Sequence, residues 1–223
     1  FAFGSQQKAI HAIDTGKFKD EIVPVSITRK KDIIVFDTDE FPNRTTTPEK
    51  MASLRPAFKK DGTVTAANAS GINDGASFVL LASEKATNDL GLIPLAEVVA
   101  TAQAGVDPAF MGMGPVPAID KVLKRVRVKL DQMDVVELNE AFAAQSLGVM
   151  IELQQQQGVD RSWLDTHCNV NGGAIALGHP IGASGNRITV TLIHEMKRRK
   201  ASYGLASLCI GGGMGTALVL RNV

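Results

Sequence analysis

The sequence predicts an α/β fold in which helices cover both faces of a mixed sheet. From Gly75 onward, short apolar runs of strand length alternate with helical segments, and this alternation is typical of layered α/β sheets. The last two strand-like runs are separated only by a glycine-rich turn, which indicates an antiparallel pair beside the other strands. With 44% hydrophobic residues over 223 positions, the chain can bury a sizeable core.

Residues 1–71 are expected to be the more irregular part. Gly16 is a suitable C-terminal cap for the first helix, and Pro56 ends the second because proline lacks an amide hydrogen and restricts the residue before it. The expected elements are helices over 6–13 and 48–54 and strands over 21–28 and 32–37.

Residues 72–223 carry the alternating series. Ser83 is expected to cap a helix because its hydroxyl can accept from first-turn amides, and Glu84 lies in that turn. The expected strands cover 76–82, 95–100, 135–138, 204–209 and 216–220, and the expected helices cover 84–90, 118–126, 141–155 and 186–199.

Composition excludes several classes of protein. Lys and Arg number 24 against 23 Asp and Glu, a net charge of +1, so nothing favours nucleic acid or an anionic membrane as a partner. No apolar run is long enough to span a membrane. The two cysteines indicate a reducing compartment such as the cytoplasm. A mitochondrial or other organellar location stays open as an alternative. Because the chain opens on Phe1 close to a helical pattern, we expect it to begin partway into a longer protein.

Three segments can carry chemistry: 138–142, 171–185 and 209–215. Each places a polar or reactive side chain at a strand end or beside glycines, where open α/β sheets form ligand sites. The sequence contains no phosphate-binding Walker loop, paired-carboxylate signature or metal-ligand spacing. We therefore expect no metal site.

His179 lies in the glycine-rich loop 171–185, directly before Pro180. Glycines let the backbone approach a ligand, and an imidazole with an ordinary pKa near ~6.5 can activate a thiol near neutral pH. A structural histidine that bonds a loop carbonyl explains the pattern equally well. The residues alone leave both interpretations open.

Cys209 ends an apolar strand and is followed by Gly211, Gly212 and Gly213. A buried cysteine usually behaves as a small hydrophobe, whereas glycines directly after it favour an exposed sulfur beside free amides, where a thiolate can form. The pattern leans toward a functional thiol. Cys168 lacks such a setting and is expected to be structural.

Three further candidates are weaker. Asn139 follows the strand over 135–138, where it can cap the next helix or hold a water or ligand oxygen. Ser70 precedes a tight turn and can contact a ligand or cap that turn. Met111 lies in an apolar loop that can line a pocket, although methionines more often only pack.

Seven segments in order along nearly the whole chain resemble the thiolase family, and specifically its acetyl-CoA acetyltransferase branch. They are 16–24, 54–58 (LRPAF), 68–76 (NASGINDGA), 111–115 (MGMGP), 139–142 (NEAF), 171–185 and 209–215 (CIGGGMG). One glycine-rich string can arise by coincidence, but seven in the family's order cannot.

Members of this family have two similar α/β halves in a layered α-β-α-β-α core, with a loop domain inserted near the end of the first half. The resemblance implies that residues 1–71 are the later part of the loop domain, 72–93 the last strand and helix of the first half, and 94–223 the complete second half. It also places the nucleophilic cysteine in a segment that precedes this sequence, so neither Cys168 nor Cys209 is that residue.

The resemblance implies a role for each candidate residue. His179 is similar to the base that activates the nucleophilic cysteine, Cys209 to the acid/base that exchanges protons with CoA and the acetyl methyl group, and Asn139 to the holder of an oxyanion-hole water. The other implied contacts are the Gly211 amide in a second oxyanion hole, Ser70 and Arg55 at CoA, and Met111, Ala141 and Phe142 at the acyl pocket.

The implied activity is reversible condensation of two acetyl-CoA to acetoacetyl-CoA and CoA, with no bound cofactor beyond these CoA thioester substrates. The implied partners are the absent first half and further copies of the full-length protein, as a homodimer or homotetramer. The chain alone is expected to be inactive. Two alternatives stay open, a 3-ketoacyl-CoA thiolase of broader chain length and a noncatalytic module that binds acyl-CoA. The segment 209–215 leans toward the short-chain type.

Overall fold

The body of the protein is a mixed four-stranded sheet with the order β3-β6-β5-β4. This computed structural model describes residues 1–30 and 32–223. The strands are β3 (Glu97–Gly105), β4 (Val135–Leu138), β5 (Tyr203–Ile210) and β6 (Met214–Arg221). β4 and β5 run parallel, whereas β6 is antiparallel to both of its neighbours. The predicted mixed sheet and its closing antiparallel pair are confirmed.

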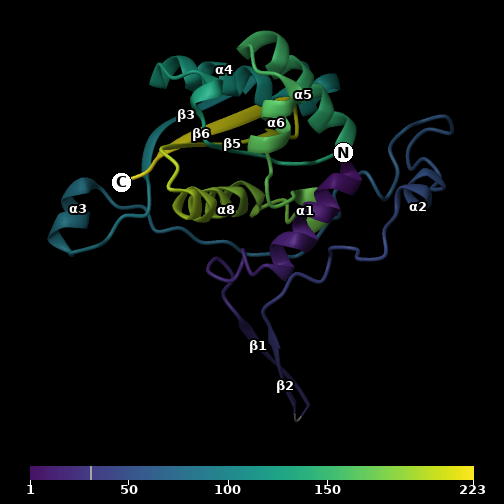
Figure 1. Cartoon of the computed structure of the whole chain (residues 1–223), viewed down its shortest axis with the longest axis horizontal. Coiled ribbons are helices and arrows are strands. Elements are labelled where there is room, and N and C mark those ends of the chain that lie inside the picture. Colours follow the sequence, from purple (N-terminus) through teal and green to yellow (C-terminus); the bar gives the residue numbers. More distant parts are fainter. Residues whose placement is uncertain (31) are drawn as a thin grey trace.

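Helices cover both faces of this sheet, as predicted. α4 (Pro115–Val126) and α5 (Ala143–Gln157) lie on one side, and α8 (Ser184–Arg199) lies on the other (Figure 1). Each side has its own apolar core, because each helix buries one stripe of side chains against the sheet. The core under α4 includes Ile119, Val122, Leu205 and Val219, and the core under α8 includes Val135, Ile188, Leu192 and Met196.

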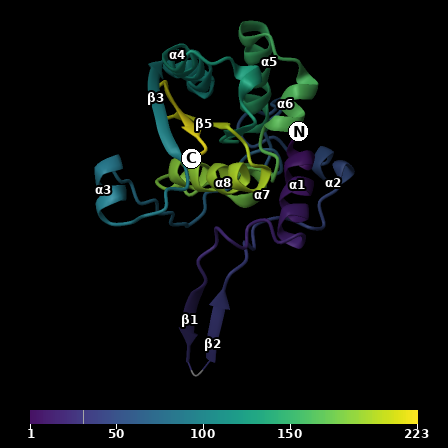
Figure 2. The same cartoon turned by 60° about the vertical axis from the view of Figure 1, so that its left-hand side comes forward.

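The first helix of the chain packs against this body, whereas the hairpin that follows it projects away. α1 (Ala2–Asp14) lies against α7 (Ala174–Leu177), and the hairpin of β1 (Val25–Arg29) and β2 (Asp32–Phe36) projects away from the sheet (Figure 2). α1 ends at Asp14, close to the predicted stop near Gly16, whose φ of 70° lets the amide of Lys17 donate to the Ala12 carbonyl at 2.8 Å. α2 covers Pro48–Ala52.

The predicted cap of α3 (Glu84–Asp89) is confirmed, because the Ser83 hydroxyl accepts from the Ala86 amide at 3.2 Å. The predicted strand over 76–82 is wrong. Those residues have no regular structure, and Phe78 and Leu80 are 88% and 82% exposed. A strand needs the backbone of a neighbour, and no described segment pairs with this one.

Several short helices were not predicted. The loop around Met111 forms the 3-10 helix η1 (Pro108–Met113), a second 3-10 turn η2 covers Leu130–Gln132, and α7 lies inside the glycine-rich loop. α6 (Arg161–His167) starts at Asp160, whose carboxylate accepts from the Trp163 amide at 2.7 Å. Among the helices of residues 1–30 and 32–223, none has both the length and the apolar character needed to cross a bilayer.

Candidate active site

The ends of β4 and β5 bring two candidate residues to the same edge of the sheet. Leu138 is paired in parallel with Ser207, and the backbone amide of Asn139 donates to the Ser207 carbonyl at 3.0 Å. Cys209 follows Ser207 by two positions on β5. Asn139 and Cys209 therefore lie at the carboxyl ends of adjacent parallel strands, which is where α/β sheets form ligand sites.

The side chain of Asn139 has an unusual environment. It is 2% exposed, yet neither its Oδ1 nor its Nδ2 makes a hydrogen bond to any described residue. The interpretation of Asn139 as a helix cap is wrong, because α5 begins only at Ala143, after Phe142. Burying a polar group without a partner costs about 1–3 kcal/mol, so this amide is a strong candidate for binding a water or a ligand oxygen.

His179 is held by the segment that follows Ser70. Its backbone amide donates to the Gly71 carbonyl at 3.0 Å, and its ring Nδ1 lies 2.5 Å from the hydroxyl of Ser184 at the start of α8. The preceding Gly178 has a φ of 95°, and a Cβ there would lie 2.5 Å from Oδ1 of Asn73. Only glycine fits this turn, so the backbone conformation itself aims the histidine.

The electrostatics of His179 suit a base. Partial burial and the positive charge of Arg187 both lower the pKa of the imidazole, because each disfavours the charged form. The ring is therefore neutral at pH 7 and can accept a proton. Its ring hydrogen bond goes to a serine hydroxyl, rather than to the loop carbonyl of the structural alternative.

Cys209 pairs with Gly215 across the β5–β6 hairpin and is half-buried. Burial raises the pKa of its thiol, so at neutral pH the sulfur carries its proton. The glycine-rich setting suggested an exposed thiolate, but the structure shows a shielded thiol that can donate a proton. Cys168 is buried more deeply, and burial raises its pKa to about 12, as expected of a structural cysteine.

The turn after Cys209 requires glycine at Gly213. Its φ is 88°, and a Cβ there would lie 2.4 Å from the Val106 carbonyl oxygen. We expect Gly213→Ala to lower the free energy of unfolding by about 2–3 kcal/mol, because left-handed strain and a backbone clash add. Urea denaturation measures this loss. Gly211→Ala is the matched control, since Gly211 has no neighbour within 4 Å of the added carbon; an equal loss in both variants would contradict the argument.

Ser70, Ala141 and Phe142 lie together. The backbone amide and the hydroxyl of Ser70 both donate to the Ala141 carbonyl, at 3.0 and 2.9 Å, and Ala69 bridges to Phe142. The next residues, Gly71 and Ile72, bridge to His179. This one segment therefore links the 139–142 turn to the histidine loop.

Met111 is partly buried in a short helix against the sheet, whereas Arg55 is exposed. Met111 lies in η1, which contacts β5 and β6, and the adjoining Gly114 packs so tightly on Met214 that a Cβ would lie 2.2 Å from its carbonyl oxygen. Phe58, in the same segment 54–58 as Arg55, places its ring edge-on to that of Phe142, with the ring centroids 6.4 Å apart.

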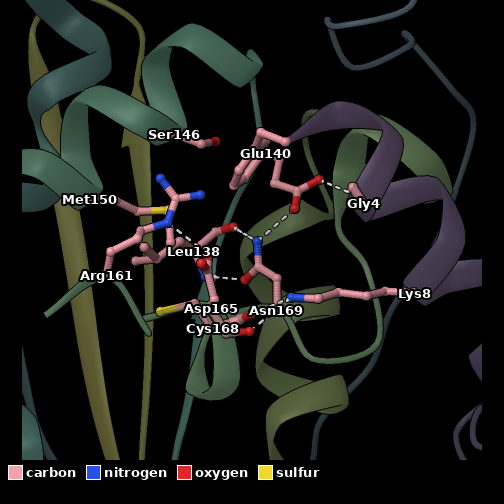
Figure 3. Close-up of a pocket in the computed structure, with 12 residues that line it drawn as sticks. Gly4, Lys8, Leu138, Glu140, Ser146, Met150, Arg161, Asp165, Cys168 and Asn169 are labelled. Atoms are coloured by element: carbon pink, nitrogen blue, oxygen red, sulfur yellow. Dashed lines mark hydrogen bonds and ion pairs between the residues drawn. The ribbon is translucent and has the colours of Figure 1, made fainter. Parts of the chain in front are cut away.

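Glu140 is a site residue that the sequence predictions missed. It is 1% exposed, and its carboxylate accepts from the Ser5 hydroxyl at 2.6 Å. It also accepts from Nδ2 of Asn169 at 2.9 Å (Figure 3). The Ile175 amide donates to it as well, at 3.3 Å. The Glu140 carboxylate thus joins α1 and the glycine-rich loop to the turn that carries Asn139. The available signal was its place inside the 139–142 segment, directly after Asn139 at a strand end.

A cavity of about 230 Å³ opens beside Glu140, between α1, α5 and α6 (Figure 3). Met150 and Arg161 are among the residues that line it. Asn139, His179 and Cys209 are not part of its lining, so this cavity is separate from the predicted catalytic residues.

Comparison with known proteins identifies the family. Residues 92–222 match the family model described as thiolase, C-terminal domain, and residues 1–85 match thiolase, N-terminal domain. The chain belongs to the thiolase family. The resemblance inferred from the seven sequence segments is confirmed, and so is the α/β fold class that it implied.

Relatives in the thiolase family match over the whole chain. The acetyl-CoA acetyltransferase of Cupriavidus necator is 57% identical over 223 residues, which cover 100% of this chain and 55% of that protein. The crystal structure of the Bacillus anthracis acetyl-CoA acetyltransferase matches with a TM-score of 0.92 and 49% identity, covering 100% of this chain and 54% of that one.

The crystal structure of human mitochondrial 3-ketoacyl-CoA thiolase matches with a TM-score of 0.88 and 43% identity, again over 100% of this chain and 54% of the other. The chain therefore spans about half the length of the thiolases it matches.

Proposed function

We propose that this chain is the second half of an acyltransferase that reversibly condenses two acetyl-CoA into acetoacetyl-CoA and CoA. The observation that carries the proposal is the position of Asn139 and Cys209 at the ends of adjacent parallel strands, with an Asn139 amide that is buried and has no protein partner among the described residues. The segment 69–72 adds support, because it is bonded both to the 139–142 turn and to the His179 loop. The names of the relatives at 49–57% identity support the short-chain substrate.

The proposed division of the chain follows the family architecture. Residues 1–71 are the later part of the loop domain, 72–93 close the first half, and 94–223 form the second half. The rest of the first half carries the nucleophilic cysteine and covers the segment 72–93. The exposed apolar side chains there support this partner, since a surface of this kind marks an interface; they are Phe78, Leu80, Leu81 and Ile93, each more than 75% exposed. The complete protein forms a homodimer or homotetramer.

The first chemical step transfers an acetyl group to the nucleophilic cysteine. His179, neutral at pH 7, takes the thiol proton, and the resulting thiolate attacks the thioester carbonyl of acetyl-CoA. The tetrahedral oxyanion accepts from the Gly211 amide. As it collapses, the C–S bond to CoA breaks and the thiol of Cys209 protonates the leaving thiolate. A thiol with a raised pKa holds the proton required for this transfer.

The second step forms the carbon–carbon bond. The Cys209 thiolate left by the first step removes a proton from the methyl group of a second acetyl-CoA. The enolate oxygen meets the water held by Asn139 together with His179, and one such donor is typically worth about 3–4 kcal/mol. The enolate carbon attacks the acetyl group on the nucleophilic cysteine, whose thiolate leaves and regains its proton from His179.

Substrate contacts complete the proposal. Ser70 and Arg55 contact CoA, and Met111, Ala141 and Phe142 line the acyl pocket. The hydrogen bonds from Ser70 to the Ala141 carbonyl support a continuous surface between the proposed CoA contact at Ser70 and the proposed acyl pocket at Ala141 and Phe142. No cofactor takes part beyond the CoA thioester substrates themselves.

The test is a hybrid in which this chain replaces the matching half of the Cupriavidus necator relative, to which it is 57% identical. We expect acetoacetyl-CoA thiolysis within about tenfold of the parent rate, because each half keeps its own core. The chain alone is expected to show no thiolysis and no burst of acylation by acetyl-CoA. A soluble, folded hybrid without activity would contradict the proposal, and so would acylation of the isolated chain.

A thiolase of broader chain length is the second candidate, supported by the 43% identity to human mitochondrial 3-ketoacyl-CoA thiolase. A series of 3-ketoacyl-CoA substrates distinguishes the two, since the short-chain enzyme loses rate as the acyl chain grows. A noncatalytic binding module would instead bind CoA in calorimetry without turnover in the hybrid.

A further inference from the structure

We infer that Ser184 is a positioning residue that holds His179 in the tautomer with hydrogen on Nδ1, which leaves the Nε2 lone pair free to take a proton. This inference rests on the proposed role of His179 as a base and names the group that sets its protonation geometry. Neither the motifs nor the family resemblance singled out Ser184.

The contacts of the Ser184 hydroxyl carry the inference. The side chain is 1% exposed, and its Oγ lies 2.5 Å from Nδ1 of His179 and 3.0 Å from the carbonyl oxygen of Pro180. Burial removes water as a competing partner. The hydroxyl is fixed because it stands at the first residue of α8, whose opening turn also donates the amides of Ala183 and Ser184 to the Pro180 carbonyl at 2.7 and 2.9 Å.

A hydroxyl has one hydrogen to donate and can also accept. If Nδ1 carries hydrogen, the ring donates to Oγ and the hydroxyl hydrogen meets the Pro180 carbonyl, so both short contacts are hydrogen bonds. If Nδ1 is bare, the hydroxyl hydrogen turns to the ring and the contact with Pro180 is lost. Only the first arrangement makes both short contacts of the Ser184 hydroxyl into hydrogen bonds. With Nδ1 protonated, Nε2 is the ring nitrogen with a free lone pair.

The same arrangement serves the ring before and after proton transfer. When Nε2 takes a proton, the imidazolium has N–H groups on both nitrogens, and Nδ1–H again needs an acceptor. Ser184 already accepts there, with its own hydrogen on Pro180, so no group has to turn during the reaction. Donors and acceptors that need no reorganisation are the main source of electrostatic catalysis.

The tautomer can be read directly by NMR on the chain labelled with ¹⁵N-histidine, since it has only four histidines. His179→Gln assigns the signal by its loss. Above the pKa of the ring, we expect the unprotonated nitrogen of His179 to be Nε2. In Ser184→Ala the ring should shift toward the Nε2–H form that free imidazole prefers, and Ser184→Thr should restore the wild-type pattern because it keeps the hydroxyl.

Thr189→Ala is the matched control. Thr189 lies on the same helix, and its hydroxyl bonds the Gly185 carbonyl one turn back at 2.8 Å, just as Ser184 bonds Pro180. The Thr189→Ala variant therefore loses the same kind of hydrogen bond within the helix but no contact with His179. The His179 tautomer should not change in this variant. An Nε2–H tautomer in the wild type, or the same spectrum in Ser184→Ala, would overturn the inference.

Kinetics in the hybrid give a second readout. Ser184→Ala should lower kcat on the order of 10–100-fold with little change in KM, the size seen when a residue that orients a metal-binding histidine is lost. The acidic limb of the pH profile should move to lower pH, because the imidazolium loses an acceptor. An inactive wild-type hybrid with the expected tautomer would refute the proposed function alone, whereas an active hybrid with the other tautomer would refute only the role of Ser184.

Discussion

Cys209→Ala in the hybrid enzyme is expected to lower both thiolysis and condensation by about 10²–10⁴-fold, the usual contribution of a general acid–base. The thiol is the proposed group that both protonates CoA and removes the methyl proton, and burial keeps it protonated in the resting state. Acylation of the nucleophilic cysteine should still occur, only more slowly. Steady-state turnover and a single-turnover acylation assay with labelled acetyl-CoA measure the two effects separately.

Cys168→Ala is the control for this experiment. Cys168 is the only other cysteine, is 5% exposed and lies in the core under α4 and α5. Its replacement should lower the free energy of unfolding by about 1 kcal/mol through lost packing and leave turnover unchanged. Turnover in Cys209→Ala at the level of Cys168→Ala would refute the assigned role.

Raising the pH from 5 to 9 is expected to destabilise the fold through Glu137. This residue on β4 is 1% exposed, neither carboxylate oxygen makes a hydrogen bond to the described protein, and its nearest cation is Arg187 at 4.0 Å. Burial raises the pKa of Glu137 to about 8, and burial likewise raises the pKa of Glu21 to about 7. The other acidic groups close enough to influence Glu137 or Glu21 are Asp39, Glu140 and Glu195.

The sign follows from proton linkage. In the unfolded chain Glu137 has its ordinary pKa of 4.5, so between pH 4.5 and about 8 the folded state holds a proton that the unfolded state has lost. The stability from this group is complete below pH 4.5 and is lost as the pH rises through 8, with a slope on the order of 1 kcal/mol per pH unit. The slope should flatten above pH 8.

Glu137→Gln tests this directly, because glutamine is close in shape and stays neutral. The variant should match the wild type near pH 5 and exceed its stability at pH 9 in urea denaturation. Glu40→Gln, at an exposed position, should leave the pH dependence unaltered. A constant difference between wild type and Glu137→Gln across the pH range would contradict the expectation.

The sequence predicted a strand or a helix end correctly where residues within one turn or one short run determine it. The bounds of β4 were predicted to the residue, because its short run of mainly apolar, strand-forming residues is bounded by polar ones. The caps at Ser83 and Gly16 followed from side-chain and backbone chemistry within one turn. The run over 76–82 has a similar composition but forms no strand, because a strand depends on a partner backbone that a local pattern cannot report.

The candidate site divides in a similar way. The amino-acid sequence by itself determined the α/β class, the family and the three segments that carry Asn139, His179 and Cys209, because residue types and their order are all that such motifs need. Only the tertiary structure decided that the Asn139 amide is buried without a protein partner, that Cys209 keeps its proton and that Ser184 meets the ring of His179. Burial and hydrogen bonding arise between elements distant in the chain, as when Gly71 binds the amide of His179, and they set the protonation state of each group.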